Sequence, residues 1–144
     1  MTFPDGCPFH LALPVHDLEA AEHFYVHVLG AGVGRVDPGH WLDLNLGGHQ
    51  VSLHLKPEAC ASVATNAVDG DAVPVRHFGL VLPMPAWRTL AARLEEAQVD
   101  LIVPPKVRFA GQAGEQATLF VRDPSGNALE FKSFADKRAL FARD

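Results

Sequence analysis

The order of predicted elements is the same in the two halves of this chain, and this repetition is the feature that most constrains the fold. The first half has a strand, a helix and three more strands, predicted at residues 9–15, 18–29, 32–37, 41–46 and 49–55. The second half repeats that order at residues 76–83, 85–98, 101–107, 116–122 and 127–134. The assignments rest on alternating apolar residues for strands, helical spacing for helices, and turn residues between them. The chain therefore reads as two copies of one βαβββ unit.

Each copy is expected to form a four-stranded sheet that its helix covers on one face. The predicted fold class is α+β, with two βαβββ modules whose uncovered sheet faces are either buried against each other or enclose a ligand cavity. The modules cover about residues 8–56 and 75–134 of a single domain, and a short C-terminal helix is predicted at about 135–144. Residues 57–74 are small, polar and turn-forming, so a surface linker without regular structure is expected there.

Composition narrows the possible partners. The 144 residues carry a formal charge of −5 with a pI of about 5.8, which argues against a nucleic-acid or anionic-membrane partner and favours a small-molecule substrate. The two cysteines, Cys7 and Cys60, fit neither a disulfide framework nor a metal motif. With no secretory pattern at the N-terminus and no apolar run long enough to span a bilayer, a cytoplasmic location is expected.

Two of the eight histidines occupy equivalent places in the two copies. His10 and His77 each lie on the face of a predicted first strand that is opposite to the larger apolar side chains. A small residue follows two positions later, Ala12 or Gly79, and leaves space beside each imidazole. Glu130 lies on the polar face of the last predicted strand. Two imidazoles and a carboxylate form a facial ligand set for a divalent first-row metal, with open positions for substrate or oxygen.

His54 lies on the polar face of the strand predicted at 49–55 and is the expected counterpart of Glu130 in the first module. Counting from the turn glycine weighs against that match, because Glu130 is four residues after Gly126 and the same count from Gly48 reaches Ser52. Two roles for His54 stay open: a fourth metal ligand, or an acid/base beside the metal-bound substrate.

Three stretches resemble the vicinal oxygen chelate superfamily, which includes glyoxalase I, type I extradiol dioxygenases, fosfomycin-resistance enzymes and bleomycin-binding proteins. They are FHLALPVHDLEAAEHFYVHVLG, HFGLVL and LFVRDPSGNALEFKSF, and the DPxGNxxE pattern in the last is the most specific. The resemblance covers nearly the whole chain. It implies the glyoxalase/dioxygenase fold, in which two βαβββ modules pair into a curved mixed sheet around a metal cleft. It also implies metal ligands at His10, His77 and Glu130, with His54 at the fourth position.

The resemblance also implies the chemistry. In this superfamily, substrate oxygens chelate a metal that stabilises an anionic intermediate. Two histidines and one carboxylate favour Fe(II) or Mn(II) and oxygen activation, whereas a fourth protein ligand favours Zn(II), Ni(II) or Co(II) and isomerisation. The predicted function is an extradiol-dioxygenase-like oxidoreductase acting on a small catechol-like substrate, with His54 moving a proton.

Alternative functions stay open. One is a glyoxalase-like lyase or isomerase with four ligands, and another is a non-catalytic binding protein of the drug-resistance type. The ring-cleaving members usually carry a tyrosine before the carboxylate strand, whereas the single tyrosine here, Tyr25, lies on the first predicted helix. Related proteins often form dimers, so a homodimer is one expected assembly.

Other residues receive weaker predictions. Five histidines are expected at the surface without a role in chemistry: His16, His23, His27, His40 and His49. Trp41 and Phe120 are predicted core residues. The loop before residue 116 carries Arg108, Gln112 and Glu115, which either reach a polar substrate or belong to a solvated connection.

Overall fold

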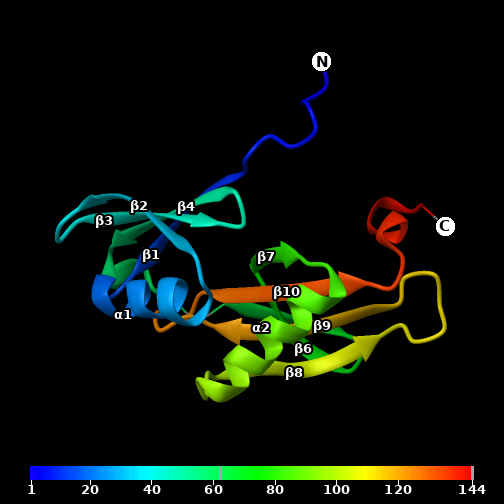
Figure 1. The fold of residues 1–144 in the computed structure, drawn as a ribbon. Helices are drawn as coiled ribbons and strands as arrows, with labels where there is room; N and C mark the ends of the chain where they lie inside the picture. The colour runs from blue at the N-terminus through cyan, green and yellow to red at the C-terminus, as the bar shows by residue number, and fades with distance from the viewer. Residues whose placement is uncertain (62, 144) are drawn as a thin grey trace. The chain divides into compact units, whose positions relative to one another are not determined.

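The computed structural model describes residues 1–61 and 63–143, and it divides the chain into two compact units. They are Met1–Ala61 and Ser62–Asp144. Each unit is built on one four-stranded mixed sheet (Figure 1). The predicted α+β class and the repeated βαβββ order are therefore confirmed.

The first unit follows the predicted order of elements. Its helical segment changes from an α-helix to a π-helix at His23. Its elements are β1 (His10–Val15), α1 (Leu18–Glu22), the π-helix η1 (His23–Val28), β2 (Gly32–Asp37), β3 (Trp41–Leu46), β4 (His49–Leu55) and the 3-10 turn η2 (Pro57–Ala59). The strand order is β1-β4-β3-β2, and β1 runs parallel to β4. Asp17 caps the helix, since its side chain accepts a hydrogen bond from the Ala20 N–H at 3.0 Å.

Strand alternation divides the first sheet into an apolar face and a polar face. The apolar side chains are buried together with helix residues; they are Val15, Leu42, Leu44, Val51, Leu53, Ala21, Phe24 and Tyr25. Figure 1 shows α1 lying along this sheet. His10 and the polar residues of β3 and β4 are consequently left on the other face.

The second unit contains the same βαβββ plan, preceded by an additional hairpin. Its elements are β5 (Ala64–Val68), β6 (Asp71–Val75), β7 (Phe78–Val81), α2 (Met84–Glu96), β8 (Leu101–Arg108), β9 (Gln116–Arg122), β10 (Ala128–Phe134) and the 3-10 helix η3 (Lys137–Phe141). The strand order is β7-β10-β9-β8, with β7 parallel to β10. The two sheets thus have the same topology.

The prediction of an unstructured linker at 57–74 is wrong. Strands β5 and β6 pair in this stretch around Asp69 and Gly70, which have φ of 47° and 83°. An Asp-Gly pair with both residues at positive φ is the preferred turn of a two-residue hairpin. The turn signal was therefore present, but the small side chains on either side concealed the strands.

The predicted C-terminal helix at 135–144 is shorter than expected. One 3-10 segment, η3, forms after Asp136, whose carboxylate accepts a hydrogen bond from the Arg138 N–H at 3.0 Å. The last predicted position, Asp144, lies outside the described residues. Between residues 1 and 61 and between 63 and 143, no helix is long and apolar enough to cross a membrane.

Charged and apolar contacts attach the extra hairpin to the sheet of the second unit. The Asp71 carboxylate lies 2.8 Å from Lys106 Nζ and 2.9 Å from Arg108 Nη2, and Arg108 also donates to the Val68 carbonyl at 2.7 Å. Val73 packs in a buried cluster with Val103 and Phe120. Arg108 is only 3% exposed, and its Nη1 and Nη2 atoms both hold the hairpin, so this cation has a structural role.

Replacing Arg108 with methionine is expected to lower the free energy of unfolding by about 2 kcal/mol, because it removes charge-assisted hydrogen bonds from a buried site. Urea unfolding followed by circular dichroism measures the loss. Arg122→Met is the matched control, since the Arg122 side chain is 46% exposed and pairs with Asp100 at 3.5 Å. The control should cost less than about 0.5 kcal/mol, and equal losses in the two variants would contradict the anchoring role.

Candidate functional site

The second unit brings His77 and Glu130 into direct contact. His77 immediately precedes β7, and Glu130 lies on β10 opposite Gly79. His77 Nε2 is 3.1 Å from Glu130 Oε2, and the two side chains are 32% and 12% exposed. Two residues that are 53 positions apart in sequence thus meet through the parallel pairing of β7 with β10.

This contact depends on a glycine at position 79. A Cβ built there would overlap the backbone of Glu130, its carbonyl oxygen above all. Any larger residue would therefore push apart the two strands that carry His77 and Glu130. Gly79 was predicted to leave space beside the imidazole. In the structure it allows the backbones of β7 and β10 to approach each other closely.

Neighbouring groups fix the orientation of both side chains. His77 Nδ1 lies 2.6 Å from the Pro74 carbonyl oxygen, so Nδ1 carries the proton and donates it there. Thr118 Oγ1 donates to Glu130 Oε1 at 2.7 Å. The Phe120 ring contacts the His77 ring edge to face, with centroids 5.0 Å apart. Nε2 of the imidazole and Oε2 of the carboxylate are consequently the two atoms directed at each other.

The pair is electrostatically coupled. The hydrogen bond with Glu130 is the largest cause that raises the pKa of His77, and the Pro74 carbonyl adds to it against the effect of burial. Burial is the largest influence on Glu130 and acts to raise its pKa. The hydrogen bonds from His77 and Thr118 and the charge of Lys132 outweigh burial, so the pKa of Glu130 lies below its ordinary value.

His77 and Glu130 line a pocket of about 150 Å³ within the second unit. Its lining residues are His77, Phe78, Gly79, Leu80, Val81, Glu130 and Lys132. Lys132 follows Glu130 by two positions on the same face, and its Nζ lies 3.9 Å from Glu130 Oε2. The pocket therefore combines an imidazole, a carboxylate and an ammonium group beside apolar side chains.

The donor atoms fit a divalent metal. In octahedral coordination, bonds of about 2.1 Å from one ion to a nitrogen and an oxygen at right angles separate these atoms by about 3 Å. His77 Nε2 and Glu130 Oε2 are 3.1 Å apart. The Nδ1 hydrogen bond to a backbone carbonyl is also the usual outer contact of a metal-binding histidine. In neither described unit do three His, Cys, Asp or Glu side chains already form a cluster for a metal ion.

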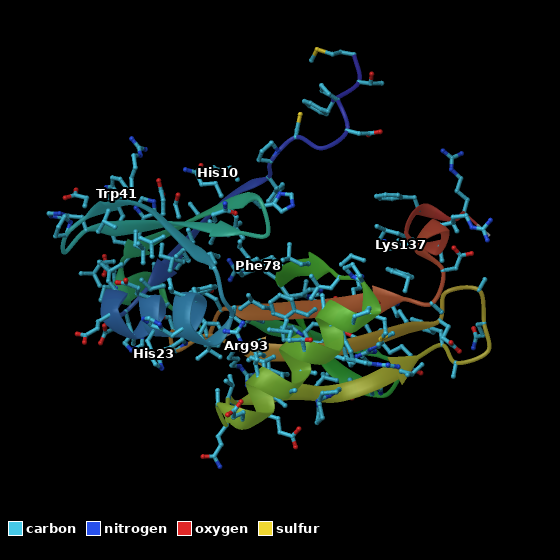
Figure 2. The ribbon with its side chains drawn as sticks, in the orientation of Figure 1. His10, His23, Trp41, Phe78, Arg93 and Lys137 are labelled. Atoms are coloured by element: carbon cyan, nitrogen blue, oxygen red, sulfur yellow. The ribbon has the colours of Figure 1, made fainter. Side chains whose placement is uncertain are left out.

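The polar face of the first unit carries His10 and a buried carboxylate. His10 begins β1 beside Gln50 of β4 and is exposed. Figure 2 labels it near the start of that strand. Asp43 of β3 is 7% exposed and accepts hydrogen bonds from Ser52 Oγ at 2.5 Å and Gln50 Nε2 at 3.2 Å. Arg35 Nε is 3.8 Å from the same carboxylate. Neither Asp43 nor Ser52 was predicted from the sequence to take part in chemistry.

The strand registers show which positions correspond in the two units. Ser52 lies opposite Ala12, two residues after His10, whereas Glu130 lies opposite Gly79, two residues after His77. Ser52 therefore corresponds to Glu130. By the same registers, His54 lies opposite Pro14 and corresponds to Lys132, which lies opposite Val81. The count from the turn glycine pointed to this register.

Two of the three loop residues considered as substrate contacts, Arg108 and Glu115, have structural partners, whereas Gln112 is exposed. Arg108 is buried against the hairpin, and Glu115 Oε2 accepts a hydrogen bond from the Gly111 N–H at 2.7 Å. Phe120 is a core residue at 1% exposure, as predicted. Trp41 is only half-buried, and the Arg35 guanidinium lies over its ring at 5.5 Å from the centroid.

The five other histidines belong to the first unit, and none of them is among the residues that line the pocket of the second unit. His23, His27 and His40 are exposed, and the rings of His23 and His27 lie 5.6 Å apart. His49 is half-buried, and its Nδ1 accepts a hydrogen bond from the Phe9 N–H at 2.9 Å. His16 is exposed at the end of β1.

Alternation gave the polar faces correctly, but Lys132 and Thr118 were missed as site residues. Each lies on the Glu130 face by the β9–β10 register, in which Thr118 pairs with Lys132. The spacing of two residues between Glu130 and Lys132 was a signal in the sequence. For Thr118 only the pairing of β9 with β10 supplies the contact.

This chain is similar in sequence to a known protein family and in structure to several solved proteins. The profile of the Glyoxalase/Bleomycin resistance protein/Dioxygenase superfamily matches residues 8–131. Among curated proteins, none matches the chain. A solved glyoxalase/bleomycin resistance protein/dioxygenase from Alicyclobacillus acidocaldarius is 30% identical, with a TM-score of 0.78 over 94% of this chain and 97% of that chain.

Two more distant structures share the fold. Lactoylglutathione lyase from Agrobacterium tumefaciens is 22% identical, with a TM-score of 0.65 over 97% of this chain and 99% of that chain. The fosfomycin resistance protein FosX from Listeria monocytogenes is 14% identical, with a TM-score of 0.67 over 90% of this chain and 93% of that chain. Since the family profile spans most of its length, the chain belongs to the glyoxalase/bleomycin resistance protein/dioxygenase superfamily.

Proposed function

We propose that this chain is a metal-dependent oxidoreductase that resembles the extradiol dioxygenases and acts on a small, catechol-like substrate. The proposed metal ligands are His10, His77 and Glu130. The observation that carries the proposal is the 3.1 Å contact between His77 Nε2 and Glu130 Oε2 in a pocket. A bound divalent ion would polarise two chelating substrate oxygens as a Lewis acid.

The first unit supports a set of three protein ligands. Its position corresponding to Glu130 holds Ser52, whose hydroxyl is bonded to Asp43. A neutral hydroxyl that already donates to a carboxylate is a weak ligand, so coordination positions stay open for substrate and oxygen. This arrangement favours Fe(II) or Mn(II) over Zn(II), Ni(II) or Co(II).

The other polar residues hold or move protons. The Pro74 carbonyl keeps the proton of His77 on Nδ1, and Thr118 holds one oxygen of Glu130 so that the other faces the pocket. His54 is exposed on the polar face of β4 and takes the proposed role of acid/base, which its register favours over ligation. A homodimer is the proposed assembly.

Two alternatives have specific supports. The lactoylglutathione lyase from Agrobacterium tumefaciens shares this fold, and a glyoxalase-like lyase would require a fourth ligand, for which His54 is the candidate. A non-catalytic binding protein would need no metal. This alternative is tested because the family includes bleomycin resistance proteins.

Activity assays with anaerobically reconstituted protein separate these functions. Fe(II)- or Mn(II)-loaded protein should consume oxygen with catechols and leave the hemithioacetal of methylglyoxal and glutathione unchanged. An active Ni(II) or Zn(II) form that is inert towards catechols contradicts the dioxygenase proposal and favours the lyase. Protein that takes up no metal under reconstitution contradicts both enzymes and leaves the binding protein.

The metal content of single-substitution variants should separate the ligand histidines from the others. His10→Ala, His77→Ala and Glu130→Gln are each expected to lower metal affinity at least about tenfold, because each removes a donor from the ion. His54→Ala should retain stoichiometric metal while losing turnover, and the exposed helix variant His23→Ala should retain both. Elemental analysis after desalting measures the metal. Loss of metal in His54→Ala would instead assign it as a ligand.

Metal uptake should release the proton that His77 shares with Glu130. Because the pKa of His77 is raised above its ordinary value of about 6.5, protons compete with the metal at pH values above 6.5 as well. Apparent Zn(II) affinity should fall about tenfold for each pH unit below that raised pKa. Competition with a chromophoric chelator at several pH values measures the slope, and an affinity independent of pH across this range would contradict the role of His77.

The metal-free protein should show the opposite side of this linkage. The raised pKa of His77 means that its protonated form, bonded to Glu130, stabilises the folded state. This stabilisation is complete below about pH 6.5 and is lost as the pH rises through the raised pKa. Urea unfolding of the wild type should therefore weaken over that interval. Glu130→Gln, which removes the largest cause of the shift, should reduce this dependence on pH.

A further inference from the structure

Lys132 is a charged residue of the pocket that neither the ligand set nor the packing of the fold uses. It lies on β10 opposite Val81, two residues beyond Glu130, and its side chain is 31% exposed. Its Nζ lies 5.7 Å from the centroid of the Phe134 ring. The aliphatic stem therefore lies along the sheet, and the ammonium group reaches the pocket that His77 and Glu130 also line.

The ammonium group has an incomplete ion pair. In residues 1–61 and 63–143, the one carboxylate within 4.0 Å of Lys132 Nζ is that of Glu130. Their separation of 3.9 Å is longer than a hydrogen bond, and the two oxygens of Glu130 already bond to His77 and Thr118. Lys132 thus lies beside a carboxylate whose hydrogen-bonding capacity is directed elsewhere.

Metal binding would leave this lysine without a counter-charge. Our inference rests on the proposed function, in which Glu130 contributes its negative charge to a divalent ion. An ammonium group beside that ion would then experience net repulsion unless a further anion entered the pocket. The ligand that completes the site is therefore expected to carry negative charge within reach of Lys132.

We propose that Lys132 binds a carboxylate group of the substrate and selects a small carboxylated molecule that also has a chelating pair of oxygens. One lysine is present among the pocket residues and no arginine. A single ammonium group matches a monoanionic carboxylate, whereas a dianionic phosphate or phosphonate calls for several cationic donors. Phe78, Leu80 and Val81 supply the apolar surface for the body of such a molecule.

The corresponding position in the other module supports a role in ligand contact. His54 corresponds to Lys132 by strand register, so both modules place a long polar side chain two residues beyond the position of Ser52 or Glu130. Because neither side chain is buried, the fold does not require a charged residue at either place. The two modules differ in the charge of this residue, and the second module carries a permanent cation at this position.

Binding of two matched ligands to Zn(II)-loaded protein tests the proposal, since zinc has no redox chemistry and the ligands are not consumed. The probes are 3,4-dihydroxybenzoate and catechol, which share the chelating oxygens and differ by one carboxylate. Isothermal titration calorimetry should give about tenfold tighter binding of the carboxylated ligand to the wild type. In Lys132→Met this preference should fall to about one tenth of its wild-type value, with metal content retained.

Lys137→Met is the control, because Lys137 is an exposed lysine of the same unit outside the pocket. It should keep the wild-type preference. An equal preference in wild type and Lys132→Met overturns the role of Lys132 while leaving the metal site intact. Protein that takes up no Zn(II), or metal-loaded protein that binds neither probe, overturns the proposed function and this inference with it.

Discussion

The parallel pairing of β7 with β10 is the constraint on which the candidate site depends. It places Gly79 against the backbone of Glu130, so that His77, two residues earlier, reaches the carboxylate. Thr118 and the Pro74 carbonyl then fix the outer atoms of the pair. Because these contacts leave Nε2 and Oε2 facing each other, the backbone register determines the donor geometry and the side chains only complete it.

The two modules use one topology for different chemistry. At corresponding positions, the first unit has Ser52 bonded to buried Asp43, and the second has Glu130 bonded to Thr118. In the first unit the carboxylate lies on the neighbouring strand β3, where strand pairing places Asp43 opposite Ser52. Duplication of a fold therefore does not duplicate its ligands, since a few side chains on the polar face can change while the apolar face keeps each sheet packed.

Much of the fold could be predicted from the sequence because its signals are local. Alternation and helical spacing predicted both modules, and the turn at Gly48 joins β3 to β4 as expected. The hairpin at 64–75 was missed because its strands contain small side chains, and burial against β8 and β9 stabilises it. Arg108 was likewise considered for substrate binding, although its partners are 37 or more residues away in sequence.

By itself the sequence determined the repeated βαβββ order and the polar face of each strand. It could not determine which residues on neighbouring strands stand side by side, because a shift of two residues leaves every side chain on the same face. His54 and Ser52 differ by one such shift. Only the tertiary structure decided that Ser52 corresponds to Glu130 and that Lys132 shares its pocket, since backbone pairing between distant strands fixes the register.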